Sequence, residues 1–126
     1  MHPFRAVVES GDLSGVPALL AEDVVFHSPV AFAPYRGRAL VAGIVEAAFE
    51  VFADFRYEKE VADGSDHVLV FRARVGDKEV HGADFLHVGE DGMIDELTVM
   101  VRPLSGVTAL AAAMRPRVER LLAQPA

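Results

Sequence analysis

The chain has 126 residues, of which 52% are hydrophobic and 25% are charged, with a formal net charge of -7 and no cysteine. We expect one globular domain spanning residues 1–126, in the cytoplasm, because neither a charged leader nor an apolar run of membrane length is found. The acidic balance disfavours nucleic acid and anionic membranes as partners, and the lack of cysteine excludes disulfides and thiolate chemistry.

The N-terminal segment is predicted to hold two helices and one short strand. Apolar residues follow helical spacing from Phe4 until Gly11, a typical glycine at a helix end. A second helix is predicted directly afterwards, capped by Asp12 or Ser14. Residues 24–26 then predict a brief strand.

A loop and the clearest helix of the sequence come next. Prolines and a glycine mark residues 29–39 as a loop, and loops of this length are often functional. From residue 40 to residue 52 the apolar positions repeat with the period of an α-helix.

Beyond this helix the apolar period changes to two, which is typical of β-strands. Turn residues separate the alternating runs 55–57, 67–75, 80–88 and 93–101. A last helix is predicted from Val107 and interrupted by Pro116, and its resumption through Leu122 stays open. Helices first and strands afterwards indicate an α+β fold.

The hairpin formed by the last two strands separates its residues into two faces. A two-residue turn at Glu90 and Asp91 would pair Asp84 with Leu97. One face is then apolar apart from Asp84, and from Asp95 near the turn. The other face is mixed, and its predicted members are His81, Ala83, Phe85, His87, Ile94, Glu96, Thr98, Met100 and Arg102.

Asp84 is the exception on the apolar face. Burial should raise its carboxyl pKa, so that the group stays protonated near neutrality and acts as an acid or hydrogen-bond donor. The alternative is a structural aspartate that binds backbone or a buried water.

Two stretches of the sequence resemble the bacterial ketosteroid isomerases and their SnoaL-like relatives in the NTF2-like superfamily. The first runs from Val7 to Gly37 and includes Phe-His-Ser-Pro-Val, and the second is Asp84-Phe-Leu-His-Val-Gly-Glu-Asp-Gly-Met-Ile. The resemblance covers residues 4 to about 102 in order. It implies a cone-shaped, curved antiparallel sheet wrapped on N-terminal helices, the cystatin-like α+β barrel, here with an extra C-terminal helix. It also implies an apolar pocket with its mouth between the helices and the sheet, and a homodimer through the outer sheet faces. The extra C-terminal helix would then either cover this mouth or extend the dimer contact.

The resemblance also implies site residues. The isomerases use an aspartate base, a tyrosine and a protonated aspartate that hold an enolate oxygen. The protonated aspartate corresponds to Asp84, whereas Ser28 stands at the base position and Phe4 at the tyrosine position. Ketosteroid isomerase activity is therefore not expected. The fold also resembles limonene epoxide hydrolases, whose acidic residue corresponds to Val99, so that chemistry is not expected either.

Two further side chains are candidates for the site. His27 could serve as a base, although strand alternation directs it outward if Ser28 points inward. Tyr35 could donate to a ligand or only pack its ring. No cofactor is expected, and His81 and His87 lie about 20 Å apart along one strand, too far for a shared metal. Besides Asp84 and His27 as catalytic candidates, the predicted ligand-binding residues are Phe4, Phe26, Ser28, Tyr35, Phe49, Leu97 and Val99.

Three hypotheses for function follow. The first is an isomerase, cyclase or lyase acting on a small hydrophobic carbonyl compound, with Asp84 as acid or hydrogen-bond donor. The second is a noncatalytic domain that binds a hydrophobic small molecule. The third is a dimerisation scaffold whose pocket is filled by Phe26, Phe49, Leu97 and Met114; a continuous cavity touching Asp84 would count against it.

Overall fold

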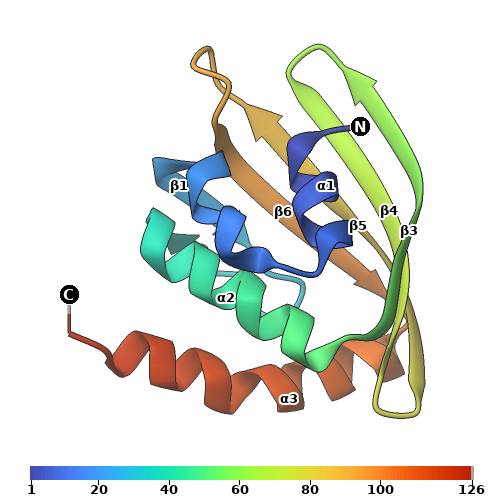
Figure 1. Cartoon of the computed structure of the whole chain (residues 1–126). Coiled ribbons are helices and arrows are strands. Elements are labelled where there is room, and N and C mark those ends of the chain that lie inside the picture. Colours follow the sequence, from blue (N-terminus) through green and yellow to red (C-terminus); the bar gives the residue numbers. More distant parts are fainter. Residues whose placement is uncertain (126) are drawn as a thin grey trace.

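A six-stranded, curved and unclosed sheet organises the molecule (Figure 1). The computed structural model describes residues 1–125. Neighbouring strands follow the order β2-β1-β6-β5-β4-β3, and all pairs are antiparallel except β1 with β6, which is parallel. The strands are β1 Leu20–His27, β2 Tyr35–Arg36, β3 Ala53–Asp63, β4 Asp66–Val75, β5 Lys78–Val88 and β6 Ile94–Arg102.

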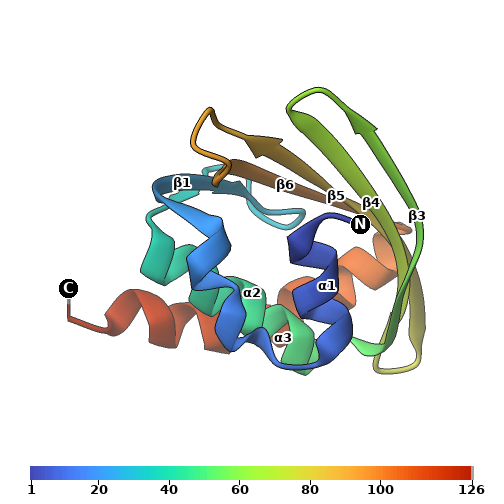
Figure 2. The same cartoon turned by 45° about the horizontal axis from the view of Figure 1, so that its top comes forward.

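Three helices lie on the concave side of this sheet (Figure 2). They are α1 Pro3–Ser10, α2 Arg38–Val51 and α3 Leu104–Ala123. Their apolar sides and the inner sheet face form one core. The α+β fold class predicted from the sequence is confirmed, and within residues 1–125 no helix is both long and apolar enough to cross a membrane.

The predicted second helix is wrong. Residues after Gly11 form two 3-10 turns, Leu13–Gly15 and Pro17–Leu19, and Leu20 already begins β1. Pro17 has no amide hydrogen and therefore starts a new turn instead of continuing the first one. Asp12 does cap this segment, because its carboxylate accepts from the amide of Ser14 at 3.0 Å. The predicted loop 29–39 also contains the short strand β2.

The predicted interruption at Pro116 is also wrong, because α3 continues through it. Pro116 cannot donate to the carbonyl of Ala112. Both residues lie on the exposed side of α3, where water can bind that carbonyl. The buried side keeps a continuous apolar row through Leu110 and Met114, with Val118 half-buried.

The β5–β6 hairpin has a different register from the predicted one. Asp84 pairs with Val99 instead of Leu97, because the turn is longer and a bulge lies near its end. His87 pairs with Glu96 and Val88 pairs with Ile94, which leaves Asp95 without a partner in the ladder. The shift by two residues keeps Asp84 on the apolar face. The bulge turns Ile94, predicted on the mixed face, into the core, where it is fully buried.

Candidate functional site

A largely apolar cavity of about 70 Å³ lies between the concave sheet face and the three helices. Three lining side chains carry oxygen atoms, those of Ser28, Tyr35 and Asp84. The remaining lining residues, six of them phenylalanines, are Phe4, Phe26, Pro29, Val30, Ile44, Val45, Ala48, Phe49, Phe52, Phe55, Phe71, Leu97, Val99, Leu110, Met114 and Val118. The wall is thus apolar with few hydrogen-bonding groups, as is usual in small-molecule sites.

The structure brings most of the predicted site residues together around this cavity. All seven predicted ligand-binding residues line it, and so does Asp84; the seven are Phe4, Phe26, Ser28, Tyr35, Phe49, Leu97 and Val99. Whether they bind a ligand stays a prediction. Ser28 already has a local role, because its hydroxyl oxygen accepts from the amide of Val30 at 3.1 Å. The ring of Tyr35 stacks near that of Phe26, with centroids 6.4 Å apart.

His27 lies apart from the other predicted site residues. Its ring is on the outer sheet face, where Nε2 lies 2.9 Å from Oε2 of Glu96. Strand alternation explains this, since Ser28 is the neighbour that faces the cavity. The geometry therefore does not favour His27 as a base acting with Asp84.

Asp84 is the buried carboxyl of the cavity wall. Its side chain comes from the middle of β5, and the residue is only 6% exposed. Burial raises the pKa of this carboxyl to about 7, although a hydrogen bond from Tyr57 partly opposes the shift. At neutral pH a large share of the molecules therefore carries a neutral acid in the wall of the cavity.

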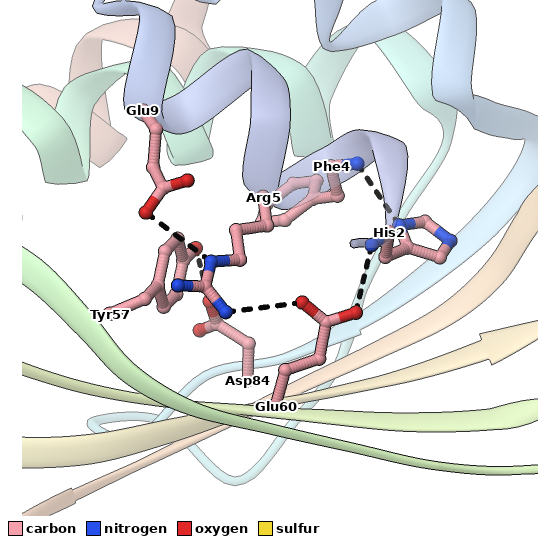
Figure 3. Close-up of polar contacts among 7 residues, drawn as sticks. All are labelled: His2, Phe4, Arg5, Glu9, Tyr57, Glu60 and Asp84. Carbon is pink, nitrogen blue, oxygen red and sulfur yellow. Dashed lines mark hydrogen bonds and ion pairs between the residues drawn. The ribbon is translucent and has the colours of Figure 1, made fainter.

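Tyr57 is the site residue that the sequence analysis missed. Tyr57 lies in the edge strand β3, which β4 separates from the β5 strand of Asp84. Its hydroxyl donates to Oδ2 of Asp84 at 2.9 Å (Figure 3). The residue is 8% exposed. Burial, together with the nearby Asp84 carboxyl, raises the pKa of the Tyr57 phenol, which therefore stays protonated.

A sequence signal for this pair did exist. Tyr57 shares the alternating pattern with Phe55 and so was due to face inward. A buried phenol needs a hydrogen-bond partner. Among the described residues, Asp84 is the one polar or charged residue that is buried in the core. The order of the strands, which the pattern does not specify, was needed to connect the two.

A glycine makes room for the aromatic wall beside Asp84. A Cβ atom at Gly82 would lie 2.5 Å from Cζ of Phe71 and 2.6 Å from the carbonyl oxygen of Met100. Phe71 pairs with Gly82 across β4 and β5, and its ring stacks on that of Phe55 at 4.8 Å. The missing side chain at residue 82 thus leaves space for the Phe71 ring to lie over β5 and line the cavity.

Within residues 1–125, no group of three or more histidine, aspartate or glutamate side chains is arranged to hold a metal ion. The cavity wall carries one carboxyl, one phenol and one aliphatic hydroxyl, and Tyr57 donates a hydrogen bond to the carboxyl.

Comparisons with known proteins agree with this architecture. The pattern of the SnoaL-like domain matches residues 2–97. The chain belongs to the SnoaL-like family. A crystal structure of a steroid delta-isomerase from Pseudomonas aeruginosa is 42% identical, with 97% of this chain and 90% of that chain covered and a TM-score of 0.89.

Two further structures extend this SnoaL-like assignment. An uncharacterised bacterial protein with a cystatin-like fold from Silicibacter pomeroyi is 38% identical over 97% of this chain and 92% of that one, with a TM-score of 0.90. An NTF2-like protein of unknown function from Mesorhizobium loti shares the fold at 23% identity, over 80% and 86% of the two chains, with a TM-score of 0.71. Together with the SnoaL-like domain match and the steroid delta-isomerase structure, these findings confirm the predicted NTF2-like superfamily. No curated protein matches the chain.

Proposed function

We propose that this SnoaL-like protein binds a small hydrophobic carbonyl compound in the cavity and acts on it as an isomerase, cyclase or lyase. Asp84 is the acid or hydrogen-bond donor to the carbonyl oxygen. The observation that carries the proposal is a buried carboxyl in a largely apolar cavity wall, and this burial raises the pKa of Asp84 to about 7. A neutral carboxyl donates to a carbonyl oxygen and stabilises the negative charge that develops there.

The size of the cavity supports a small ligand. Its 70 Å³ is far below the roughly 300–1,000 Å³ of sites for drug-sized molecules. A polycyclic ligand would require the phenylalanine side chains of the wall to move. A ligand with one ring or a short chain requires less rearrangement.

Steroid isomerisation of the ketosteroid isomerase type is not part of the proposal. The similar protein from Pseudomonas aeruginosa carries the name steroid delta-isomerase, which supports an apolar carbonyl substrate. In this chain, however, the position of the base holds Ser28 and the position of the tyrosine holds Phe4. Among the described residues that line the cavity, Asp84 is the sole carboxylate and there is no imidazole. Reactions that need carbonyl polarisation suit this wall better than reactions that need a strong base.

A noncatalytic binding domain is the alternative. It needs the same cavity and the same donor, and it explains why no base is required. A pure dimerisation scaffold fits less well, because the cavity beside Asp84 is continuous and is not filled by the side chains around it.

Binding of a matched pair of probes tests the proposal. Cyclohexanone and methylenecyclohexane have nearly the same shape, but only the ketone accepts a hydrogen bond. At pH 5.5 we expect the ketone to bind about fivefold more tightly, as one hydrogen bond allows. At pH 8.5 Asp84 is mostly ionised, and the preference should vanish.

Asp84→Asn is the control, because its amide can still donate but cannot titrate. It should prefer the ketone equally at both pH values in a calorimetric or NMR titration. Equal binding of the two probes to the native protein at pH 5.5 would contradict the proposal. Exchange of the α-protons of cyclohexanone in deuterated water, compared with the rate without protein, then separates the two hypotheses. An enzyme that polarises the carbonyl accelerates proton removal by the solvent, and a binding domain does not.

We also propose that the protein forms a homodimer through the outer sheet face. That face exposes Phe85 and Met100, at 37% and 57%. Burial of such side chains against a second copy would favour association. Sedimentation should report a dimer, and Met100→Glu should shift it towards monomer. A native protein that is monomeric at all concentrations would contradict this assembly.

A further inference from the structure

Tyr57 reaches Asp84 across an intervening strand. It pairs with Phe71 of β4, and Phe71 in turn pairs with Gly82 of β5, two residues from Asp84. Two strand spacings amount to about 10 Å, so a long side chain is needed to cover the distance. Tyr57 is not among the residues that line the cavity. Its contact with Asp84 is therefore made on the inner face of the sheet, beside the residues that line the cavity.

The direction of the hydrogen bond between the two groups is determined by their surroundings. A phenol has one proton to donate, and Asp84 is the only hydrogen-bond partner of the Tyr57 hydroxyl among the described residues. If Asp84 donated to Tyr57 instead, the phenol proton would be buried without an acceptor. That arrangement carries the cost of an unsatisfied buried donor. Tyr57 therefore donates, and Oδ2 of Asp84 accepts.

This direction determines which oxygen holds the acid proton. In a neutral carboxyl group the carbonyl oxygen is the better acceptor, and the proton is on the other oxygen. Oδ1 of Asp84 has no hydrogen-bond partner among residues 1–125, and Asp84 lines the cavity. We propose that Tyr57 is a positioning residue that holds Oδ2 of Asp84 as the carbonyl oxygen, so that the acid proton is on Oδ1 and is available to a ligand. The inference rests on the proposed function of Asp84 as donor.

Residues of α1 and β3 hold the Tyr57 ring in place. The guanidinium carbon of Arg5 lies 5.7 Å from the centre of the ring, and the Phe55 ring meets it edge-on at 4.9 Å. Arg5 itself is bound by Glu9 and Glu60, each at 3.3 Å (Figure 3). The N-terminal helix is thus attached to β3 beside the phenol, which restricts the orientation of its hydroxyl.

Tyr57→Phe tests this role by two measurements. The first needs no ligand: infrared titration of the Asp84 carboxyl, identified by its loss in Asp84→Asn. Removing the hydrogen bond to the carboxylate form should raise the titration midpoint. The second is the preference for cyclohexanone over methylenecyclohexane at pH 5, where Asp84 is neutral in both proteins. We expect that preference to fall about fivefold, because the acid proton is no longer held on Oδ1.

Tyr35→Phe is the matched control, since it removes a phenol from the cavity wall without touching Asp84; it should leave the midpoint unchanged. If Tyr57→Phe does not fold, 3-fluorotyrosine at residue 57 replaces it. Its more acidic phenol is a stronger donor and should lower the midpoint.

An unchanged midpoint in the residue-57 variant would overturn the inference, and so would a changed midpoint with the ketone preference intact at pH 5. If the native protein shows no ketone preference at all, the proposed function fails, and the ligand-free midpoint still reports on the Tyr57 bond separately.

Discussion

The two faces of β5 carry carboxyl hydrogen bonds of opposite character. On the inner face, Tyr57 donates to the buried Asp84 at 2.9 Å. On the outer face, Nδ1 of His87 lies 2.6 Å from Oδ1 of Asp95, and both side chains are more than 40% exposed. The outer contact is the shorter one. The pKa shift is nevertheless larger on the inner face, because burial raises the pKa of Asp84 to about 7.

Burial, more than distance, separates the two pairs. The Asp95 carboxylate raises the pKa of His87, but both side chains are partly exposed to water, which weakens their interaction. At Asp84 the loss of hydration disfavours the charged form, and the phenol compensates only in part. One strand thus presents a solvated ion pair on one side and a neutral acid on the other.

The pH dependence of stability should show the largest difference between the faces. The pKa of Asp84 rises from its ordinary value of 3.8 to about 7 on folding, so the native state keeps a proton that the unfolded state loses. Stability should therefore fall as pH rises from about 4 to about 7, by about 4 kcal/mol for this group. Asp84→Asn should lack this component. Urea denaturation of both proteins at pH 4.5 and pH 8 measures the difference.

Asp95→Asn on the outer face is the control for this prediction. The same chemical change at an exposed carboxylate should leave the pH dependence close to that of the native protein. If Asp84→Asn and the native protein keep the same difference in stability at both pH values, Asp84 is not neutralised by burial, and the contrast between the faces is lost.

Added volume should also have different effects on the two faces. Gly82→Ala places a methyl group against Phe71 and the Met100 carbonyl on the inner face, and should destabilise the protein by about 1–3 kcal/mol. Ala83→Ser adds one atom on the outer face and should change stability by less than about 0.5 kcal/mol. Thermal denaturation compares the two variants. Equal effects would mean that the inner wall can repack freely.

Much of this contrast could be predicted from the sequence. A period of two assigns side chains to faces without any knowledge of register. For that reason Asp84, Leu97 and Val99 were predicted on one wall, and they line the cavity although Asp84 pairs with Val99 instead of Leu97. An error of two residues in register leaves the faces intact. The bulge at Asp95 shifts the register by one residue, which moves a side chain to the opposite face. Ile94 is therefore buried in the core, although it was predicted on the mixed face.

The partner of Asp84 could not be predicted by the same reasoning. Alternation directs Tyr57 inward, but its contact with Asp84 depends on β4 lying between β3 and β5 and on the register that pairs Tyr57 with Phe71 and Phe71 with Gly82. These are properties of the assembled sheet. Pro116 was misjudged for a related reason, since its cost depends on whether the carbonyl of Ala112 is exposed to water.

Added salt should produce the smallest of these effects, a change in the pKa of His87 on the outer face with no change in the pKa of Asp84 on the inner face. The raised pKa of His87 depends mainly on the Asp95 carboxylate, and about 1 M sodium chloride shortens the Debye length to about 3 Å. The His87 pKa should therefore move down towards its ordinary value, as measured by NMR titration. The Asp84 pKa arises from burial, which salt does not screen, and should stay where it is. A fall of the Asp84 midpoint with salt would mean that water reaches this carboxyl, and its availability as a neutral donor would then depend on the ligand excluding that water.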